Sequence, residues 1–244
     1  MKVSVLSYSF RDLLAEGKMD IFGYQETCKY RYGLDATDIW NSFLVSTDVN
    51  TETSGGGAML DMAVYHIAQM LFLLGNPRVL SVSGTTYQKL DNMYEDRRQA
   101  SRYNVEELGM AIVRLAGGIT FFLEEAWAIY GGDPDSDYIY GSHGGLRVNP
   151  LTYFTTVADL EMNGTFDVRQ ADWRWQQCVP QERDYTNSQQ HWVAAQLGRV
   201  PLLDTAGIAL NTAFITEGVY LSGHLGHEVT AQEIEQAKPG LGRS

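Results

Sequence analysis

The stretch Gly55–Pro77, GGGAMLDMAVYHIAQMLFLLGNP, decides the fold of the chain. After three glycines its apolar residues recur with the spacing of one helix face: Leu60, Val64, Ile67, Leu71 and Leu74. That spacing predicts an amphipathic helix over Ala58–Leu74. The turn residues Gly75-Asn76-Pro77 predict its end.

Beyond this helix the sequence alternates between strand-like runs and turn signals. Short turns such as Ala116-Gly117-Gly118 join neighbouring strands and favour antiparallel pairing. We expect helices again at about Ser188–Leu197 and Thr205–Ser222. The prediction is an α+β fold with a large, mostly antiparallel sheet and flanking helices. The expected strands are Arg78–Gln88, Glu107–Leu115, Ile119–Ala128, Asp137–Tyr140, Gly145–Val148 and Thr165–Trp175.

The N-terminal region has a different pattern. Lys2–Phe10 predicts a strand, Met19–Tyr32 a helix and Leu34–Trp40 a second strand. Such a β-α-β unit is typical of parallel sheets. We therefore divide the chain into a strand-helix-strand segment (1–45), a polar junction (46–54), an α+β domain (55–235) and a flexible tail (236–244).

Residues 1–40 resemble the opening of sugar phosphate isomerase/epimerase TIM barrels, through KVSVLSYSFRDLLAEGKMDIFGYQETCKYRYGLDATDIW. A TIM barrel closes with eight strand-helix units. The resemblance ends after one unit, so we expect no complete TIM barrel. No isomerase site is carried over, because that family's metal-binding residues lie on later strands.

The domain from Gly55 onward resembles the C-terminal domain of the Gfo/Idh/MocA oxidoreductases. The glycine triplet and the helix after it carry the resemblance. Further stretches extend it, namely EEAWA at Glu124–Ala128, YIYGSHGGLRVNP at Tyr138–Pro150 and the long run His191–Gly223. The resemblance implies a substrate-binding and dimer-forming domain that binds a sugar.

In that family an Asp follows the glycine triplet, and a His or Tyr comes four residues later. Asp61 and Tyr65 take these positions here and are the implied catalytic pair. Four residues apart on a helix, two side chains share one face, which suits a carboxylate that positions a proton-transfer group. The alternative for Asp61 is a favourable interaction with the helix dipole, and for Tyr65 a packed aromatic ring.

Three further residues are candidates for substrate binding: His66, Trp127 and His191. The first lies about 100° around the helix from Tyr65, so packing or solvent exposure is its alternative. For Trp127, stacking on a sugar ring competes with a role in the core. His191 heads a late helix that lines the sugar pocket in relatives, with packing as the alternative.

We expect no metal site and no disulfide. Cys28 and Cys178 have no CxxC partner, and His224 and His227 have no other ligand at a zinc-site spacing. Trp173 and Trp175 are expected on one face of a strand, buried or facing a dimer partner.

The family uses NAD or NADP, which a Rossmann domain holds by a glycine-rich turn. Only 54 residues precede Gly55, without a G-x-G-x-x-G motif, and the family's Glu-Lys-Pro motif is missing. We therefore expect no complete Rossmann domain and no cofactor bound by this chain alone. One alternative is an oxidoreductase subunit whose Rossmann domain is supplied in trans, and another is a non-enzymatic scaffold or fusion product.

Charge restricts the partners. The net charge of −12 opposes binding to nucleic acid or to an anionic membrane surface. Without a signal peptide or a long apolar run, the expected location is cytoplasmic. In relatives the open face of the large sheet packs against a second copy, which implies a homodimer.

Overall fold

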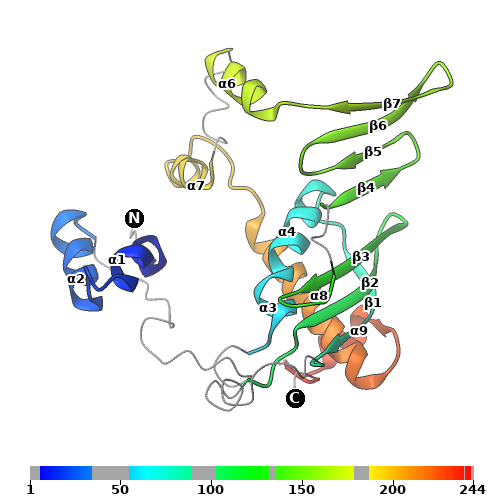
Figure 1. Cartoon of the computed structure of the whole chain (residues 1–244), viewed down its shortest axis with the longest axis horizontal. Helices are drawn as coiled ribbons and strands as arrows, with labels where there is room; N and C mark the ends of the chain where they lie inside the picture. The colour runs from blue at the N-terminus through cyan, green and yellow to red at the C-terminus, as the bar shows by residue number, and fades with distance from the viewer. Residues whose placement is uncertain are drawn as a thin grey trace.

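The computed structural model describes residues 6–34, 55–89, 103–131, 136–178, 187–238 and 240–242. Two four-stranded antiparallel sheets dominate these ranges, with strand orders β3-β2-β1-β8 and β4-β5-β6-β7. In Figure 1 the β4 edge of the second sheet faces the β3 edge of the first. The α+β prediction is confirmed, but the single large sheet is divided into two.

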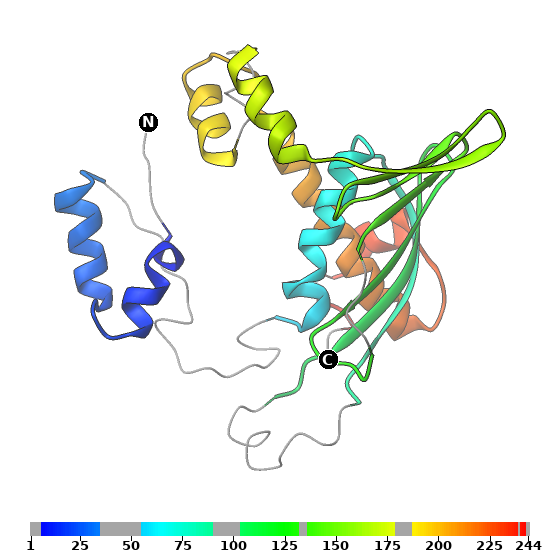
Figure 2. The same cartoon turned by 45° about the horizontal axis from the view of Figure 1, so that its top comes forward.

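The first sheet carries the core of the molecule. Its strands are β1 (Val79–Tyr87), β2 (Leu108–Leu115), β3 (Ile119–Ala126) and β8 (Val229–Thr230). On β2 the residues Ala111, Val113 and Leu115 are buried, while Ile112 and Arg114 between them are exposed, so one face packs and the other is open. Figure 2 shows helices α4 and α8 together on one side of this sheet.

Helix α8 (Thr205–Leu225) fills the centre of that core. Its Ile215 and Val219 are fully buried against sheet residues such as Val82 and Val113. Two further elements continue from it: β8, and the short helix α9 (Ala231–Gln236). None of the helices in the described ranges has the length and hydrophobicity needed to cross a bilayer.

The expected helix over Ala58–Leu74 is present in two parts, α3 (Ala58–Asp61) and α4 (Ala63–Leu73). Met62 separates them, with backbone angles of φ −104° and ψ −41°. The helix ends at Leu74, and Gly75 follows with a positive φ of 77°, as the turn signal predicts. Figure 1 shows α3 and α4 beside β3, so this helix carries its polar residues to the edge of the first sheet.

The second sheet is a meander of β4 (Tyr138–Gly141), β5 (Gly144–Arg147), β6 (Thr152–Val157) and β7 (Leu160–Thr165). The β6–β7 hairpin was not predicted. The strand expected over Thr165–Trp175 is wrong: only Thr165 belongs to a strand, and Val168–Cys178 form helix α6. Trp173 and Trp175 therefore do not share the face of a strand, and Trp173 is exposed.

The N-terminal segment is helical where a strand was expected. Ser7–Phe10 form a 3₁₀ turn that leads into α1 (Arg11–Ala15), and α2 (Ile21–Glu26) continues into a π-helical turn at Thr27–Arg31. The strand prediction is thus wrong for Ser7–Phe10, and its residues 2–5 lie outside the described ranges. The helix expected over Met19–Tyr32 is confirmed, and the strand Leu34–Trp40 falls almost wholly outside those ranges.

Helix α7 (Ser188–Gln196), which precedes α8, begins where the sequence predicts. The side chain of Asn187 accepts a hydrogen bond from the backbone N–H of Gln190 at 2.8 Å and caps this helix.

Candidate functional site

The glycine triplet is held by one buried carboxylate. Both oxygens of Glu106 accept hydrogen bonds from the N–H of Gly57 at 2.9 Å, and Oε1 also accepts from Met59 N–H at 3.1 Å. A Cβ at Gly57 would stand 2.0 Å from the backbone oxygen of Glu106, so only glycine allows this approach. The negative carboxylate meets the N–H groups at the start of α3 and fixes the helix that carries Asp61.

Helix α8 contributes to the same anchor. The hydroxyl of Tyr220 donates a hydrogen bond of 2.6 Å to Oε1 of Glu106, and the exposed fraction of Tyr220 is only 2%. Burial, followed by the bond to Glu106, raises the pKa of Tyr220 far above its usual range. Tyr220 therefore stays a donor at all physiological pH values.

Next to this anchor, Asp61 contacts Trp127. The indole Nε1–H of Trp127 donates to Oδ2 of Asp61 at 3.2 Å. Asp61 is the last residue of α3, and Trp127 directly follows β3. Asp61 is exposed and Trp127 only partly so, which leaves the contact open to solvent.

One turn further along, His66 lies between two carboxylates. Its Nδ1 is 3.2 Å from Oδ2 of Asp137, and its Nε2 is 3.8 Å from Oε2 of Glu125. The side chain of Glu125 is 13% exposed, and burial raises its pKa, although the nearby His66 opposes the shift. No set of three or more His, Cys, Asp or Glu residues in the described ranges is arranged to hold a metal ion.

The two other predicted site residues stand outside this group. Tyr65 is 67% exposed, and within the described ranges its side chain makes no hydrogen bond. His191 is buried on α7, where Nε2 accepts a hydrogen bond from Leu203 N–H at 3.0 Å. This bond ties α7 to the segment before α8, and Figures 1 and 2 show α7 standing away from α4. The structure thus pairs Asp61 with Trp127, and it pairs His66 with Asp137.

Sequence reasoning missed four residues of this region: Glu106, Glu125, Asp137 and Tyr220. One of them had a usable signal, because Glu125 is an acid at a position of β3 where the alternating pattern points to the core. A carboxylate there needs a partner. Asp137 and Tyr220 carry no such signal, since their contacts join residues 71 and 114 positions apart.

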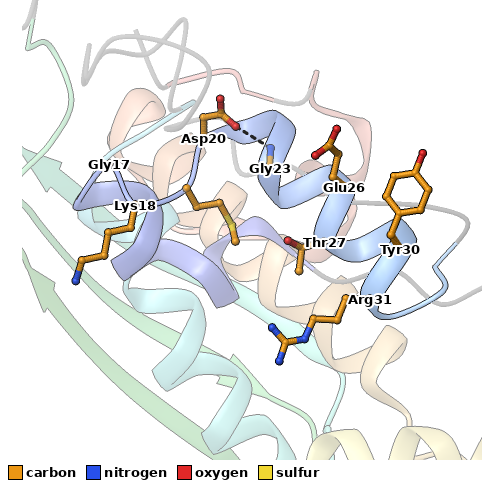
Figure 3. A pocket seen from close by; sticks show the side chains of 9 residues that line it. Gly17, Lys18, Asp20, Gly23, Glu26, Thr27, Tyr30 and Arg31 are labelled. Carbon is orange, nitrogen blue, oxygen red and sulfur yellow. Dashed lines mark hydrogen bonds between the residues drawn. The ribbon is translucent and has the colours of Figure 1, made fainter.

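A hollow lies on the N-terminal helices, and its lining differs from the residues around Asp61. Figure 3 shows its lining, which includes Lys18, Asp20, Glu26 and Arg31. Asp20 is committed to capping α2, because its side chain accepts from Gly23 N–H at 2.7 Å. Lys18 pairs with Glu16 at 2.5 Å. Lys18 and Arg31 therefore do not converge on one ligand position, and no histidine among the described residues lines the hollow.

Comparison with known proteins agrees with the fold. Residues 35–147 match the model of the GFO/IDH/MocA C-terminal domain. No match was found among proteins of curated function.

Solved structures share the fold at low sequence identity. An oxidoreductase domain protein from Kribbella flavida has a TM-score of 0.58 and 17% identity, covering 77% of this chain and 54% of that one. An NAD-binding protein from Listeria innocua has a TM-score of 0.50 and 16% identity, with coverage of 75% and 50%. An oxidoreductase from Agrobacterium radiobacter, in complex with NAD+, L-tartaric acid and magnesium, has 0.50 and 15%, with coverage of 79% and 53%. The chain spans about half the length of these proteins.

Proposed function

We propose, from the match of residues 35–147 to the GFO/IDH/MocA C-terminal domain, that this chain supplies the substrate-binding module of an oxidoreductase. Its ligand is a sugar or polyol. The observation that carries the proposal is the contact between Asp61 and Trp127 at the bend between α3 and α4, with His66 one turn away.

The chemistry of this group suits a polyhydroxylated ligand. A carboxylate accepts hydrogen bonds from hydroxyl groups, and an imidazole can accept or donate them. The indole of Trp127 adds an apolar surface beside them. A few convergent polar groups next to an aromatic ring are typical of small-molecule sites. The anchor at Glu106 keeps Asp61 in place without a ligand, which reduces the entropic cost of binding.

The residues around Asp61 do not fit the pyrophosphate of a nicotinamide cofactor. In the described ranges the ionisable side chains in contact there are the carboxylates of Asp61, Glu125 and Asp137, with His66 as the one base among them. Such a group repels the negative charges of a pyrophosphate. The proposal therefore assigns these residues to the substrate and leaves the cofactor to a nucleotide-binding domain outside residues 55–238, in trans or in a longer protein.

The test is binding of uncharged sugars and polyols, followed by NMR on the indole Nε1–H of Trp127. We expect D-glucose or myo-inositol to shift this signal, and Asp61→Asn to weaken the binding. Trp127→Phe is the matched control: it keeps an aromatic surface but loses the N–H, so it should bind more tightly than Trp127→Ala. A panel that leaves every indole signal unmoved would refute the proposal and favour the scaffold alternative.

We further propose a homodimer through the open face of the sheets. Ile112 and Phe122 are cross-strand partners on the side away from α4 and α8, and Phe122 is 63% exposed. A paired apolar surface of this kind is typical of an interface. Light scattering should give twice the chain mass for the wild type and a monomer for Phe122→Glu. A wild-type monomer at micromolar concentration would refute this part.

A further inference from the structure

The ring of His66 has a fixed surrounding that Tyr65 lacks. Nδ1 lies 3.2 Å from Oδ2 and 3.4 Å from Oδ1 of Asp137. An ionised carboxylate can only accept hydrogen bonds, so Nδ1 must carry the hydrogen in this contact. In a neutral imidazole only one nitrogen is protonated, and Nε2 is then the acceptor.

Nothing that the structure describes uses this acceptor. Oε2 of Glu125 is 3.8 Å from Nε2, which is beyond hydrogen-bond distance. The side chain of His66 is 46% exposed, so a ligand group can reach the ring. A hydroxyl fits this position because it can donate to Nε2 and accept from another donor.

We propose that Asp137 is a positioning residue that holds His66 as the Nδ1–H tautomer, so that Nε2 accepts a hydrogen bond from a ligand hydroxyl. The ligand part rests on the proposed function, whereas the tautomer does not. The assignment also moves the main polar contact from Tyr65, the position that the family resemblance indicates, to the next residue. A carboxylate that accepts from one ring nitrogen fixes the orientation of metal-binding and catalytic histidines in the same way.

The first experiment measures the tautomer of His66 by ¹⁵N NMR of the imidazole nitrogens in the full chain. His66→Asn identifies the signals among those of the five histidines. We expect the neutral ring to be protonated at Nδ1 in the wild type and in Asp137→Glu, which keeps a carboxylate. In Asp137→Asn the preference should relax, because an amide can donate as well as accept. Glu125→Gln is the matched control and should leave the tautomer unchanged.

A wild-type ring protonated at Nε2 would overturn the proposal, as would an unchanged tautomer in Asp137→Asn. If Asp137→Asn fails to fold, the wild type and Asp137→Glu still decide, since both must show Nδ1–H.

The second experiment adds myo-inositol and D-glucose. We expect a bound polyol to shift the Nε2 signal, and Asp137→Asn to weaken binding about fivefold to tenfold, the effect of one lost hydrogen bond. Binding without any change at Nε2 would overturn the ligand part alone. Confirmed tautomers with no polyol binding would instead refute the proposed function and leave Asp137 as the residue that orients His66.

Discussion

Removing the hydroxyl of Tyr220 tests the anchor of the glycine triplet. The 2.6 Å bond joins a buried donor to a buried carboxylate, and such bonds to charged groups contribute about 1.5–3 kcal/mol. Tyr220→Phe keeps the ring, so it creates little new cavity. Glu106 also keeps its bonds from Gly57 and Met59, so its charge is not left without donors. We therefore expect the free energy of unfolding to fall by about 2 kcal/mol.

Urea unfolding followed by circular dichroism measures this loss. With a slope of about 2 kcal/mol per molar urea, the midpoint should fall by about 1 M. Tyr140→Phe is the matched control, because Tyr140 is 85% exposed and its hydroxyl should change the stability by less than about 0.5 kcal/mol. Equal midpoints for the two variants would show that the bond to Glu106 does not stabilise the fold.

Three further predictions concern single residues. Gly57→Ala should lower the free energy of unfolding in urea by about 3 kcal/mol or more, because its Cβ would stand 2.0 Å from a backbone oxygen. Gly164→Ala, with open space around it, should stay near wild type. Similar losses of stability in both variants would contradict this reasoning. Burial raises the pKa of Glu125 in the folded protein. The stability that this shift contributes is fully present below the ordinary pKa near 4.5 and is lost as pH rises through the raised pKa. The melting temperature of Glu125→Gln should therefore rise relative to that of wild type between pH 4 and pH 7. A difference in melting temperature that stays constant over this range would contradict the raised pKa. Thr230→Ala should lose about 1 kcal/mol, because it breaks the capping box with Glu233 at the start of α9, while Thr230→Ser should keep most of that stability in the same urea assay.

The sequence predicts elements whose signal is local. Strands β1, β2 and β3 were predicted because each is a run rich in apolar and β-branched residues, and turn residues precede β1 and separate β2 from β3. The β6–β7 hairpin was missed because its turn, Ala158-Asp159, takes positive φ values of 50° and 63° without glycine or asparagine.

The wrong strand over Thr165–Trp175 has an identifiable cause. Trp173 and Trp175, two positions apart, favoured a strand, but Asp167 begins a helix there. Its Oδ1 accepts from the N–H groups of Arg169 and Gln170, both at 3.1 Å. Asp167 is a typical capping residue and indicates a helix start in the sequence. The aromatic residues at alternate positions favoured a strand instead.

The sequence predicted three residues of the site, Asp61, His66 and Trp127, but not the contacts that they make. Asp61 and His66 follow from the helix after the glycine triplet. Their partners Trp127 and Asp137 are 66 and 71 positions away, and no spacing rule connects them. The same is true of Glu106, whose role depends on how the segment before β2 approaches Gly57.

The position of α8 has a consequence for any attempt to shorten this protein. The match to the GFO/IDH/MocA C-terminal domain model stops at residue 147, yet Ile215, Val219 and Tyr220 occupy the middle of the core some seventy positions later. A fragment that ends at residue 147 would leave Val82 and Val113 exposed to water. It would also remove the Tyr220 hydroxyl that donates to Glu106. The region that matches the family model is therefore shorter than the region needed to complete the core, and a truncated protein should keep the longer one.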